Sequence, residues 1–338
     1  MSTFFSSQKY PSAGRTEIFS LGRLPASMVI IGGGPIGIEF AQAFTRLGTK
    51  VTVVEFLGQI LNADDRDMTD VVMSLLKDEG VEFYLDSAVE STRAVGNEVE
   101  VLFQKGGETK SIRAETLVVA TGRRVNLEGL GLENIGVALD RRGLKLDERL
   151  RTTQGHIFGA GDITGTYQFT HAAGYEGGIV VSNAIFHFPR KVDYTYLPWV
   201  TYTDPELASI GMNEKIARGR GINYSVWSDQ FVSNDRSLAE GEKIGKIKML
   251  LDEKEKPIGV QILGPQAGEL LSEWIAVMNG KVKLSTLASA VHPYPTLGEI
   301  NKRVAGNLFA TKIFSENVKK ALKFFFSLKG RACGEGTG

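Results

Sequence analysis

Three glycines at a fixed spacing form the motif with the clearest chemistry. Gly32, Gly34 and Gly37 in "IIGGGPIGIEF" follow a short apolar run and precede a helical pattern. In such a turn the first glycine allows the tight bend, the second lets a pyrophosphate approach the backbone, and the third lets the helix pack close to the strand. The start of the helix adds partial positive charge. The spacing therefore predicts a dinucleotide site, with a tight turn that binds nothing as the alternative.

Glu55 indicates which dinucleotide would bind, because it ends the next apolar run, 18 residues beyond Gly37. A carboxylate at this place can accept hydrogen bonds from both ribose hydroxyls of NAD but would repel the 2′-phosphate of NADP. An NADP site would be expected to have an arginine nearby, yet residues 56–60 read "FLGQI". We therefore expect NAD.

A second glycine-rich stretch, "HIFGAGDITG" at 156–165, has the character of a pocket wall. Three glycines, Gly161 among them, surround one carboxylate, Asp162. Without a Cβ atom these glycines would let backbone amides and the Asp162 side chain approach a large polar ligand. The run "TLVVATG" at 116–122 reads as a buried strand that ends in another glycine, Gly122.

The elements expected around these motifs alternate between strands and helices, which is typical of an α/β fold with a parallel sheet. They are strands at 28–31, 51–55 and 116–122, helices at 36–47 and, opened by acidic residues, at 64–76, and a hairpin at 98–114. Residues 123–193 are expected to hold only short elements. The segment "KVDYTYLP" at 191–198 reads as an extended linker, after which strands and helices alternate to about residue 312.

Composition and charge exclude several classes of protein. The 338 residues suggest about two domains. Lysine plus arginine equals aspartate plus glutamate, 39 each, so no overall field attracts nucleic acid. The one cysteine, Cys333, excludes an internal disulfide framework and a cysteine-rich metal cage, and no metal site is expected. We find neither a signal-peptide pattern nor a run of 18 apolar residues, so a cytoplasmic location is expected.

Five separated motifs together resemble one known family. "GGGPIGIEFAQAF", "TLVVATGRRVN", "HIFGAGDITG", "PWVTYTDPELASIG" and "HPYPTLGE" are similar, in this order, to segments of the pyridine nucleotide–disulfide oxidoreductases. The likeness covers about residues 17–312. It implies a Rossmann-like NAD domain, part of an FAD domain and a C-terminal α+β dimerisation domain, with a homodimer as the expected assembly.

The resemblance also implies roles for residues. Asp162 would contact the ribityl–phosphate part of FAD, Gly161 and Gly122 would border the flavin, and Glu39 would lie near the nicotinamide. His171 matches a segment on the flavin side, although a structural histidine is the plainer interpretation. The implied domains are a lead-in at 1–25, the NAD domain at 26–122, a remnant of the FAD domain at 123–193, the dimerisation domain at 194–312 and a basic tail at 313–338.

The family pattern also contains parts that we do not find here. Members begin with a further G-x-G-x-x-G that holds FAD, followed by a C-x-x-x-x-C pair. We therefore expect a chain that lacks the first half of its flavin domain, supplied by a separate polypeptide, by a longer gene product or not at all. The expected function is an NADH-dependent FAD oxidoreductase that passes electrons to a disulfide, a metal ion or a small acceptor. The alternative is a non-catalytic NAD-binding and dimerisation module.

The segment "HPYPTLGE" at 292–299 carries the candidate acid–base residues. Lipoamide dehydrogenase-like enzymes place a histidine directly before the Pro-Thr, paired with the glutamate, whereas this chain has Tyr294 there and keeps Glu299. Tyrosine, with a reference pKa of about 10, is a poor base near neutral pH. His292 lies two residues earlier and is expected to point elsewhere. Lipoamide and glutathione are therefore not expected as substrates, and Tyr294 and His292 as turn residues at a dimer interface are the alternative.

The C-terminal stretch "NVKKALKFFFSLKGR" allows two interpretations. It could form a basic amphipathic helix on a membrane, or Phe324 to Phe326 could cover a core. Composition alone favours the core, so membrane contact is not expected.

Overall fold

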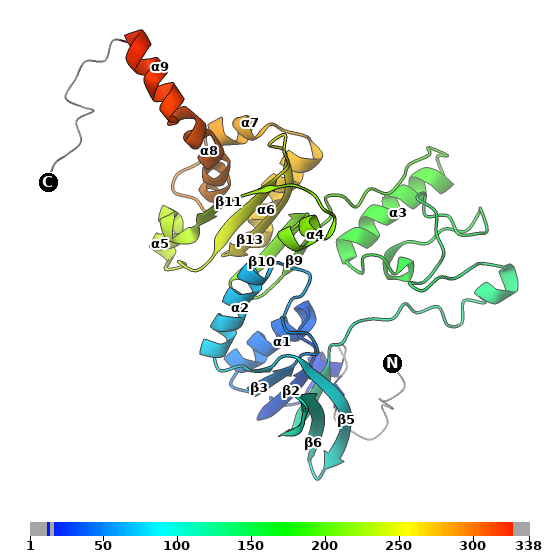
Figure 1. Cartoon of the computed structure of the whole chain (residues 1–338). Helices are drawn as coiled ribbons and strands as arrows, with labels where there is room; N and C mark the ends of the chain where they lie inside the picture. Colours follow the sequence, from blue (N-terminus) through cyan, green and yellow to red (C-terminus); the bar gives the residue numbers. More distant parts are fainter. Residues whose placement is uncertain (1–11, 14–16, 327–338) are drawn as a thin grey trace. The chain divides into compact units, whose positions relative to one another are not determined.

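A parallel sheet forms the first layer of the fold (Figure 1). The computed structural model describes residues 12–13 and 17–326. The strand order is β1-β8-β2-β3-β4, and the pairs β1/β8, β2/β3 and β3/β4 run parallel. The strands are β1 (Ser12–Ala13), β2 (Ser27–Ile31), β3 (Lys50–Val54), β4 (Glu82–Tyr84) and β8 (Thr116–Val119).

Two helices connect these parallel strands. α1 (Pro35–Arg46) lies between β2 and β3 and packs on both, and α2 (Arg66–Asp78) follows β3. The strand–helix–strand prediction is confirmed to within about one residue. The lead-in also supplies β1, which we did not predict because it is too short to produce a periodic sequence pattern.

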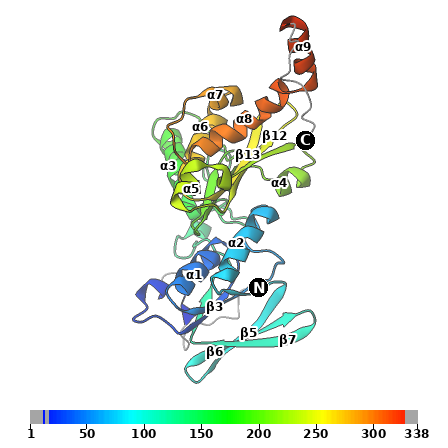
Figure 2. The same cartoon turned by 90° about the vertical axis from the view of Figure 1, so that its left-hand side faces the viewer.

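A small antiparallel sheet follows β4. It consists of β5 (Ser87–Val95), β6 (Glu98–Lys105) and β7 (Glu108–Ala114), which Figure 2 shows side by side. The predicted β6–β7 hairpin is confirmed, and its turn uses Gly106 and Gly107, both at positive φ. We did not predict β5, because its residues are mostly exposed or half-buried and give no apolar alternation.

The residues from 198 onward build a second sheet, which is antiparallel, with the order β11-β12-β13-β10-β9. Its strands are β9 (Pro198–Thr201), β10 (Glu206–Gly211), β11 (Ser225–Gln230), β12 (Lys246–Leu251) and β13 (Pro257–Gly264). The accompanying helices are α4 (Glu214–Gly219), α5 (Asp235–Glu240), α6 (Ala267–Asn279), α7 (Leu284–Ser289), α8 (Glu299–Ile313) and α9 (Glu316–Phe326), with a 3₁₀ turn, η4, at Phe231–Ser233.

Helices α6 and α8 cover this second sheet. α6 packs on β10 and β13, whereas α8 packs on β11 and β12. The fully buried Trp274 of α6 donates its indole N–H to Asn301 of α8 over 2.8 Å, so the one polar atom of a large core side chain is satisfied. No helix in the described part of the chain is long and apolar enough to cross a bilayer.

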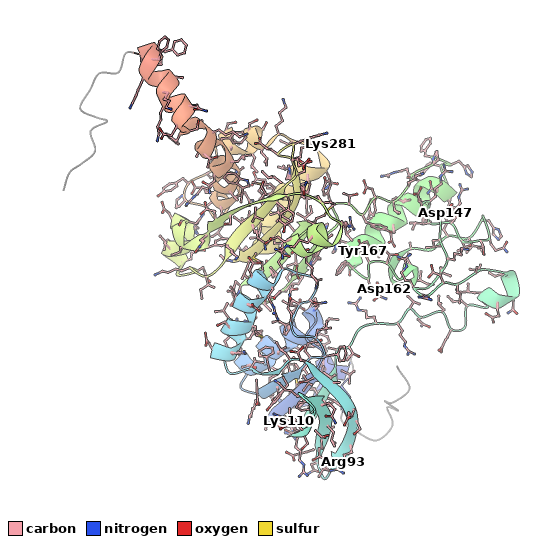
Figure 3. The ribbon with its side chains drawn as sticks, in the orientation of Figure 1. Arg93, Lys110, Asp147, Asp162, Tyr167 and Lys281 are labelled. Atoms are coloured by element: carbon pink, nitrogen blue, oxygen red, sulfur yellow. The ribbon has the colours of Figure 1, made fainter. Side chains whose placement is uncertain are left out.

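Residues 119–197 form a compact unit of their own, separate from the unit made by the residues before 119 and after 197. Unit 119–197 contains α3 (Thr170–Ala184), the 3₁₀ turns η2 (Leu132–Ile135) and η3 (Gly161–Thr164), and isolated β-bridges at Leu139–Leu144 and Arg151–Phe158. Figure 3 labels Asp147, Asp162 and Tyr167 of this unit. The prediction of short elements only was wrong. α3 buries residues 172, 176, 179 and 183 at helical spacing, but two of them are Glu and Asn, which an apolar pattern overlooks.

Asp64 joins the loop after β3 to three neighbouring strands of the second sheet. Its Oδ1 atom accepts hydrogen bonds from Trp199 Nε1 on β9 at 3.0 Å, from Ser209 Oγ on β10 at 2.7 Å and from Gln261 Nε2 on β13 at 3.0 Å. The helix predicted at 64–76 is confirmed, and it begins two residues later than expected, at Arg66, with Asp65 as its N-cap residue and Asp67 in its first turn. The carboxylates of Asp64 and Asp65 make tertiary contacts instead of capping the helix.

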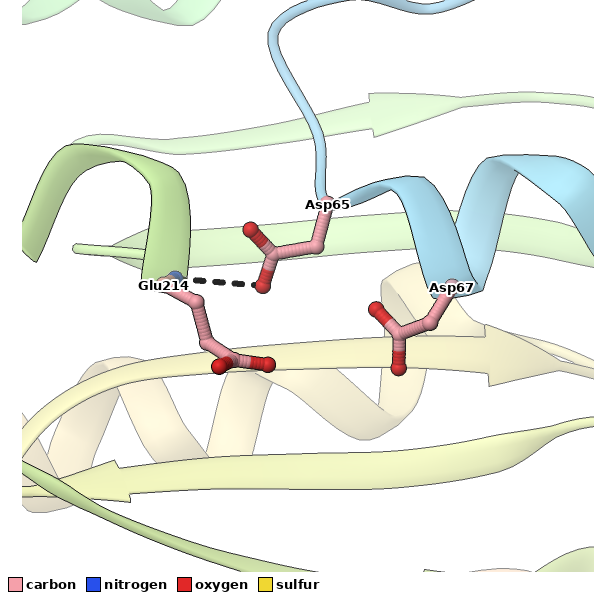
Figure 4. A group of neighbouring side chains, drawn as sticks. All are labelled: Asp65, Asp67 and Glu214. Carbon is pink, nitrogen blue, oxygen red and sulfur yellow. Dashed lines mark hydrogen bonds between the residues drawn. The ribbon is translucent and has the colours of Figure 1, made fainter. Parts of the chain in front are cut away.

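The carboxylates of Asp65, Asp67 and Glu214 gather beside this loop (Figure 4). The Nζ atom of Lys248, whose side chain is 3% exposed, lies 2.6 Å from Asp65, 2.6 Å from Asp67 and 3.1 Å from Glu214. Burial disfavours the ammonium charge, but hydrogen bonds to Asp65 and Asp67 outweigh it and raise the pKa of Lys248. Three such carboxylates could hold a cation, and here Lys248 supplies the positive charge. We call Asp64, Asp65, Asp67 and Lys248 the polar seam.

The seam gives a pH-dependent stability that the Asp64→Asn variant should remove. Burial raises the pKa of Asp64 to about 6, and its three hydrogen bonds offset this only in part. In the unfolded chain the pKa is about 3.9, so the folded state prefers the neutral acid. The stability contribution is present below about pH 4 and is lost as the pH rises to about 6.

We therefore expect Asp64→Asn to unfold like the unchanged chain near pH 4 and to be more stable by up to about 3 kcal/mol at pH 7. Urea unfolding at pH 4, 5, 6 and 7 measures this difference. A difference that stays constant over this range would contradict the assignment.

Candidate functional site

The glycine motif forms a tight turn between β2 and α1. Gly32 has a φ of 112°, which favours glycine, and its N–H donates to Val54 O on β3 over 2.9 Å. α1 begins at Pro35 with Gly34 as its N-cap, and no side chain caps this helix end. The first-turn N–H groups of α1 therefore have no side-chain acceptor in the turn, which suits an anion at this place.

The three glycines have distinguishable roles. A Cβ atom at Gly37 would lie 2.0 Å from the carbonyl oxygen of Gly32, so the turn itself requires this glycine. A Cβ atom at Gly34 would meet nothing within 4 Å, so the protein alone does not require a glycine there. A requirement for glycine at position 34 would therefore come from a ligand that lies against the backbone.

Glu55 follows β3 and braces the same turn. Its Oε2 atom accepts the N–H of Gly33, and its Oε1 atom accepts the N–H of Leu57 at 2.7 Å. A carboxylate has about four lone-pair positions, so both oxygens keep acceptor capacity for ribose hydroxyls. The structure thus brings Gly32, Gly34 and Gly37 together with Glu55, as the sequence predicted, and adds a structural duty for the carboxylate.

Glu39 on α1 contacts the loop between β9 and β10. Its Oε1 atom accepts the N–H of Tyr202 over 2.8 Å, and burial raises the pKa of this half-buried carboxyl group. Two further residues of α1 grip the same loop, since Gln42 and Arg46 both hydrogen-bond to Asp204. Glu39 therefore has a structural partner, while its predicted place near a nicotinamide stays a prediction.

In unit 119–197 the predicted flavin-contacting residues lie on turns. Gly122 and Gly161 both have positive φ, and Asp162 is the second residue of the turn η3, which Gly161 begins. Arg123 Nη1 lies 3.3 Å from Asp162 Oδ2 and donates to Gln168 O over 2.7 Å, so one guanidinium links the segments that carry Gly122 and Asp162. The Asp162 side chain remains 55% exposed. His171 stacks on Phe169, with ring centroids 5.1 Å apart, which fits a structural residue.

Glu176 holds the Gly161 segment in place, and the sequence analysis missed it. This fully buried carboxylate of α3 accepts the N–H of Gly161 at 2.6 Å and the hydroxyl of Tyr194 at 2.6 Å. Burial and the nearby Glu176 raise the pKa of Tyr194, so its hydroxyl stays protonated and donates. The sequence does contain a signal for Glu176, because this glutamate occupies a core position in the helical pattern of α3.

The candidate acid–base residues lie on the segment before α8. His292 has Nε2 3.0 Å from Glu273 Oε1 and Nδ1 3.3 Å from Ala290 O, so its carboxylate partner is Glu273 and not Glu299. Tyr294 is exposed, and its hydroxyl donates to Asp235 over 2.6 Å. This hydrogen bond raises the pKa of Tyr294, which leaves even less of the phenolate to act as a base near neutral pH, and Glu299 acts in the same direction. Catalytic roles for Glu299, Tyr294 and His292 stay predictions.

Cys333 lies outside the described residues. Phe324, Phe325 and Phe326 of α9 are exposed in the described part of the chain. The prediction that they cover a core was therefore wrong for these residues.

A parallel sheet with a glycine turn, joined to an antiparallel sheet, defines an α/β protein of the dinucleotide-binding class. The family model for pyridine nucleotide-disulphide oxidoreductases matches residues 7–177, and the model for the dimerisation domain of that family matches residues 197–305. The chain belongs to the pyridine nucleotide-disulphide oxidoreductase family. The predicted family and fold class are thereby confirmed.

Curated relatives and solved structures agree with this assignment. The chain is 37% identical over 300 residues to dihydrolipoyl dehydrogenase from Geobacillus stearothermophilus, which covers 88% of this chain and 64% of the relative. It is 36% identical over 290 residues to the mitochondrial dihydrolipoyl dehydrogenase of Caenorhabditis elegans, covering 84% and 58%.

The HOCl-induced flavoprotein disulfide reductase RclA from Escherichia coli superposes with a TM-score of 0.83 at 28% identity, over 90% of this chain and 70% of that one. The chain spans 60% to 64% of the length of the first curated bacterial relatives.

We expect Glu176→Ala to loosen the Gly161 segment. It leaves two donors, Gly161 N–H and Tyr194 O–H, without their buried acceptor, which should cost about 2–4 kcal/mol of stability. Hydrogen exchange of residues 159–165 should accelerate, and urea unfolding of the whole chain gives the free energy. Glu176→Gln keeps one oxygen acceptor, so its stability should lie between that of the unchanged chain and that of Glu176→Ala. The control, Glu148→Ala, removes an exposed carboxylate paired with Lys191 and should change stability by less than about 1 kcal/mol. Equal effects of the two alanine variants would refute the role of Glu176.

Proposed function

We propose that the chain binds NAD(H) at the turn between β2 and α1. The observation that carries this proposal is Gly34, which faces open space at an uncapped helix start, whereas its neighbour Gly37 is packed against backbone. The pyrophosphate would lie on the Gly34 backbone and the start of α1, and Glu55 would accept the ribose hydroxyls. Lipoamide dehydrogenase-type relatives use FAD and NAD(H) as cofactors.

We further propose that this chain provides part of an FAD site and acts in an NADH-dependent FAD oxidoreductase. A bound FAD would supply hydride acceptance from NADH and two-electron transfer to an acceptor. Asp162, with Gly161 and Gly122 beside it, would hold the ribityl–phosphate side. Arg123 and Glu176 would keep that segment in place.

The remainder of the flavin site is assigned to an N-terminal FAD-domain half, in the same polypeptide or in a separate chain. Unit 119–197 exposes a run of apolar side chains at the end of α3 that such a half could cover: Val181, Ile185, Phe186 and Phe188. The first acceptor is proposed as a disulfide, a metal ion or a small molecule. The chain has one cysteine, so a cysteine pair would come from outside it.

The match to the dimerisation domain favours a homodimer, and we propose that Glu299, Tyr294 and His292 act at or near its interface. We also keep the cytoplasm as the proposed location. The alternative function is a non-catalytic NAD-binding and dimerisation module. It needs only the glycine turn and the residues that match the dimerisation model.

The NAD proposal predicts different results for two neighbouring glycines. Gly34→Ala should keep the melting temperature of the unchanged chain but weaken NADH binding at least about tenfold, because the new methyl group takes the place of the pyrophosphate. Gly37→Ala should lower both the melting temperature and the affinity for NADH, since its Cβ atom collides with Gly32 O. Fluorescence titration with NADH and with NADPH measures binding, and NADPH should bind more weakly because of Glu55. Unaltered NADH binding by a folded Gly34→Ala variant would refute the site.

The visible absorption of retained flavin tests the FAD proposal. After incubation with excess FAD and removal of free flavin, we expect the chain alone to retain little absorption between about 350 and 550 nm. Together with the N-terminal half of a family member, it should retain flavin that bleaches on addition of NADH. An Asp162→Ala variant should lose this retained flavin while still binding NADH. A mixture that stays colourless while NADH still binds would favour the non-catalytic module.

A further inference from the structure

Helix α9 (Glu316–Phe326) presents an apolar face that the described chain does not cover. Val318, Leu322 and Phe325 follow one another at spacings of four and three residues and therefore lie on one side of the helix. None of the α9 residues is buried, and the ring of Phe325 is 77% exposed. Phe326, at 69% exposed, extends this face at the helix end.

The other side of α9 is basic. Lys323 follows Lys319 by four residues and Lys320 by three, so the three lysines share the opposite side. The one acidic residue of the helix, Glu316, lies 2.8 Å from Lys319. α9 therefore combines three lysines and one glutamate with an exposed aromatic and aliphatic face.

We propose that α9 is a docking surface for an anionic lipid bilayer. In this arrangement the apolar side enters the boundary between head groups and acyl chains, and the lysines extend to the anionic head groups. Eleven residues of helix measure about 16 Å, roughly half the thickness of a hydrocarbon core, so the helix lies in the plane of the surface. This interaction goes beyond the proposed function and is independent of it.

Charge distinguishes a lipid surface from a second copy of the chain. The chain has 39 basic and 39 acidic residues, so another copy offers no net negative charge to the lysines of α9. An anionic bilayer has this charge, together with an apolar layer directly beneath it, and it matches both sides of the helix.

The test is co-sedimentation of the full chain with vesicles of phosphatidylcholine alone and with vesicles that also contain phosphatidylserine. We expect binding to the anionic vesicles, weaker binding to the neutral ones, and loss of binding on addition of salt. Leu322→Ser with Phe325→Ser should abolish the binding. Lys320→Glu with Lys323→Glu should weaken it at least about 25-fold, at roughly fivefold for each lysine lost.

The matched control is Phe19→Ser, which removes a ring that is 80% exposed elsewhere in the chain and should leave vesicle binding unchanged. NADH titration and the melting temperature show whether each variant is folded, and neither should change in the α9 variants. The proposal is overturned if the folded chain does not sediment with anionic vesicles, or if the α9 variants bind like the unchanged chain. It is equally overturned if these variants change only the mass of the oligomer, because α9 would then be a contact between copies.

Discussion

One buried acid, Asp64, ties the loop after β3 to the antiparallel sheet. A single oxygen atom accepts hydrogen bonds from three adjacent strands, and the next acids, Asp65 and Asp67, meet the buried ammonium of Lys248 on a fourth. A buried charge is tolerated only when it is paired or hydrogen-bonded, so each partner depends on the others. The polar seam thus fixes one arrangement where apolar packing alone would leave more freedom.

The glycine turn depends on a different constraint, the close approach of two backbone segments. Because Gly37 lies against the Gly32 carbonyl, helix α1 starts directly after the end of β2. Glu55, which follows the neighbouring strand β3, reaches back to the Gly33 amide. Further along α1, Glu39 and Arg46 hold the loop at Tyr202 and Asp204. The same helix therefore connects the candidate nucleotide turn to the part of the chain that matches the dimerisation model.

The sequence was informative where function and structure use local spacing, and less so elsewhere. The turn at Gly32 to Gly37, its flanking strands and the β6–β7 hairpin were predictable, because each depends on neighbours within a few residues. Glu176 and Asp64 were not, since their partners lie 15 to 197 residues away and a polar residue in a core pattern looks like an interruption. The partner of His292 was missed for the same reason, because Glu273 lies 19 residues away on helix α6.

The polar seam also defines which pieces of this chain could be exchanged with those of a relative. A chimera that takes the loop with Asp64 from one protein and the strands that contact it, including Lys248, from another would leave several buried charges without partners. The chain boundaries near residues 118 and 198 are different, because residues 119–197 form a unit of their own and the seam joins only segments outside it. We therefore expect that residues 119–197 can be replaced as a block by those of a relative, whereas the segments before and after them must come from the same protein.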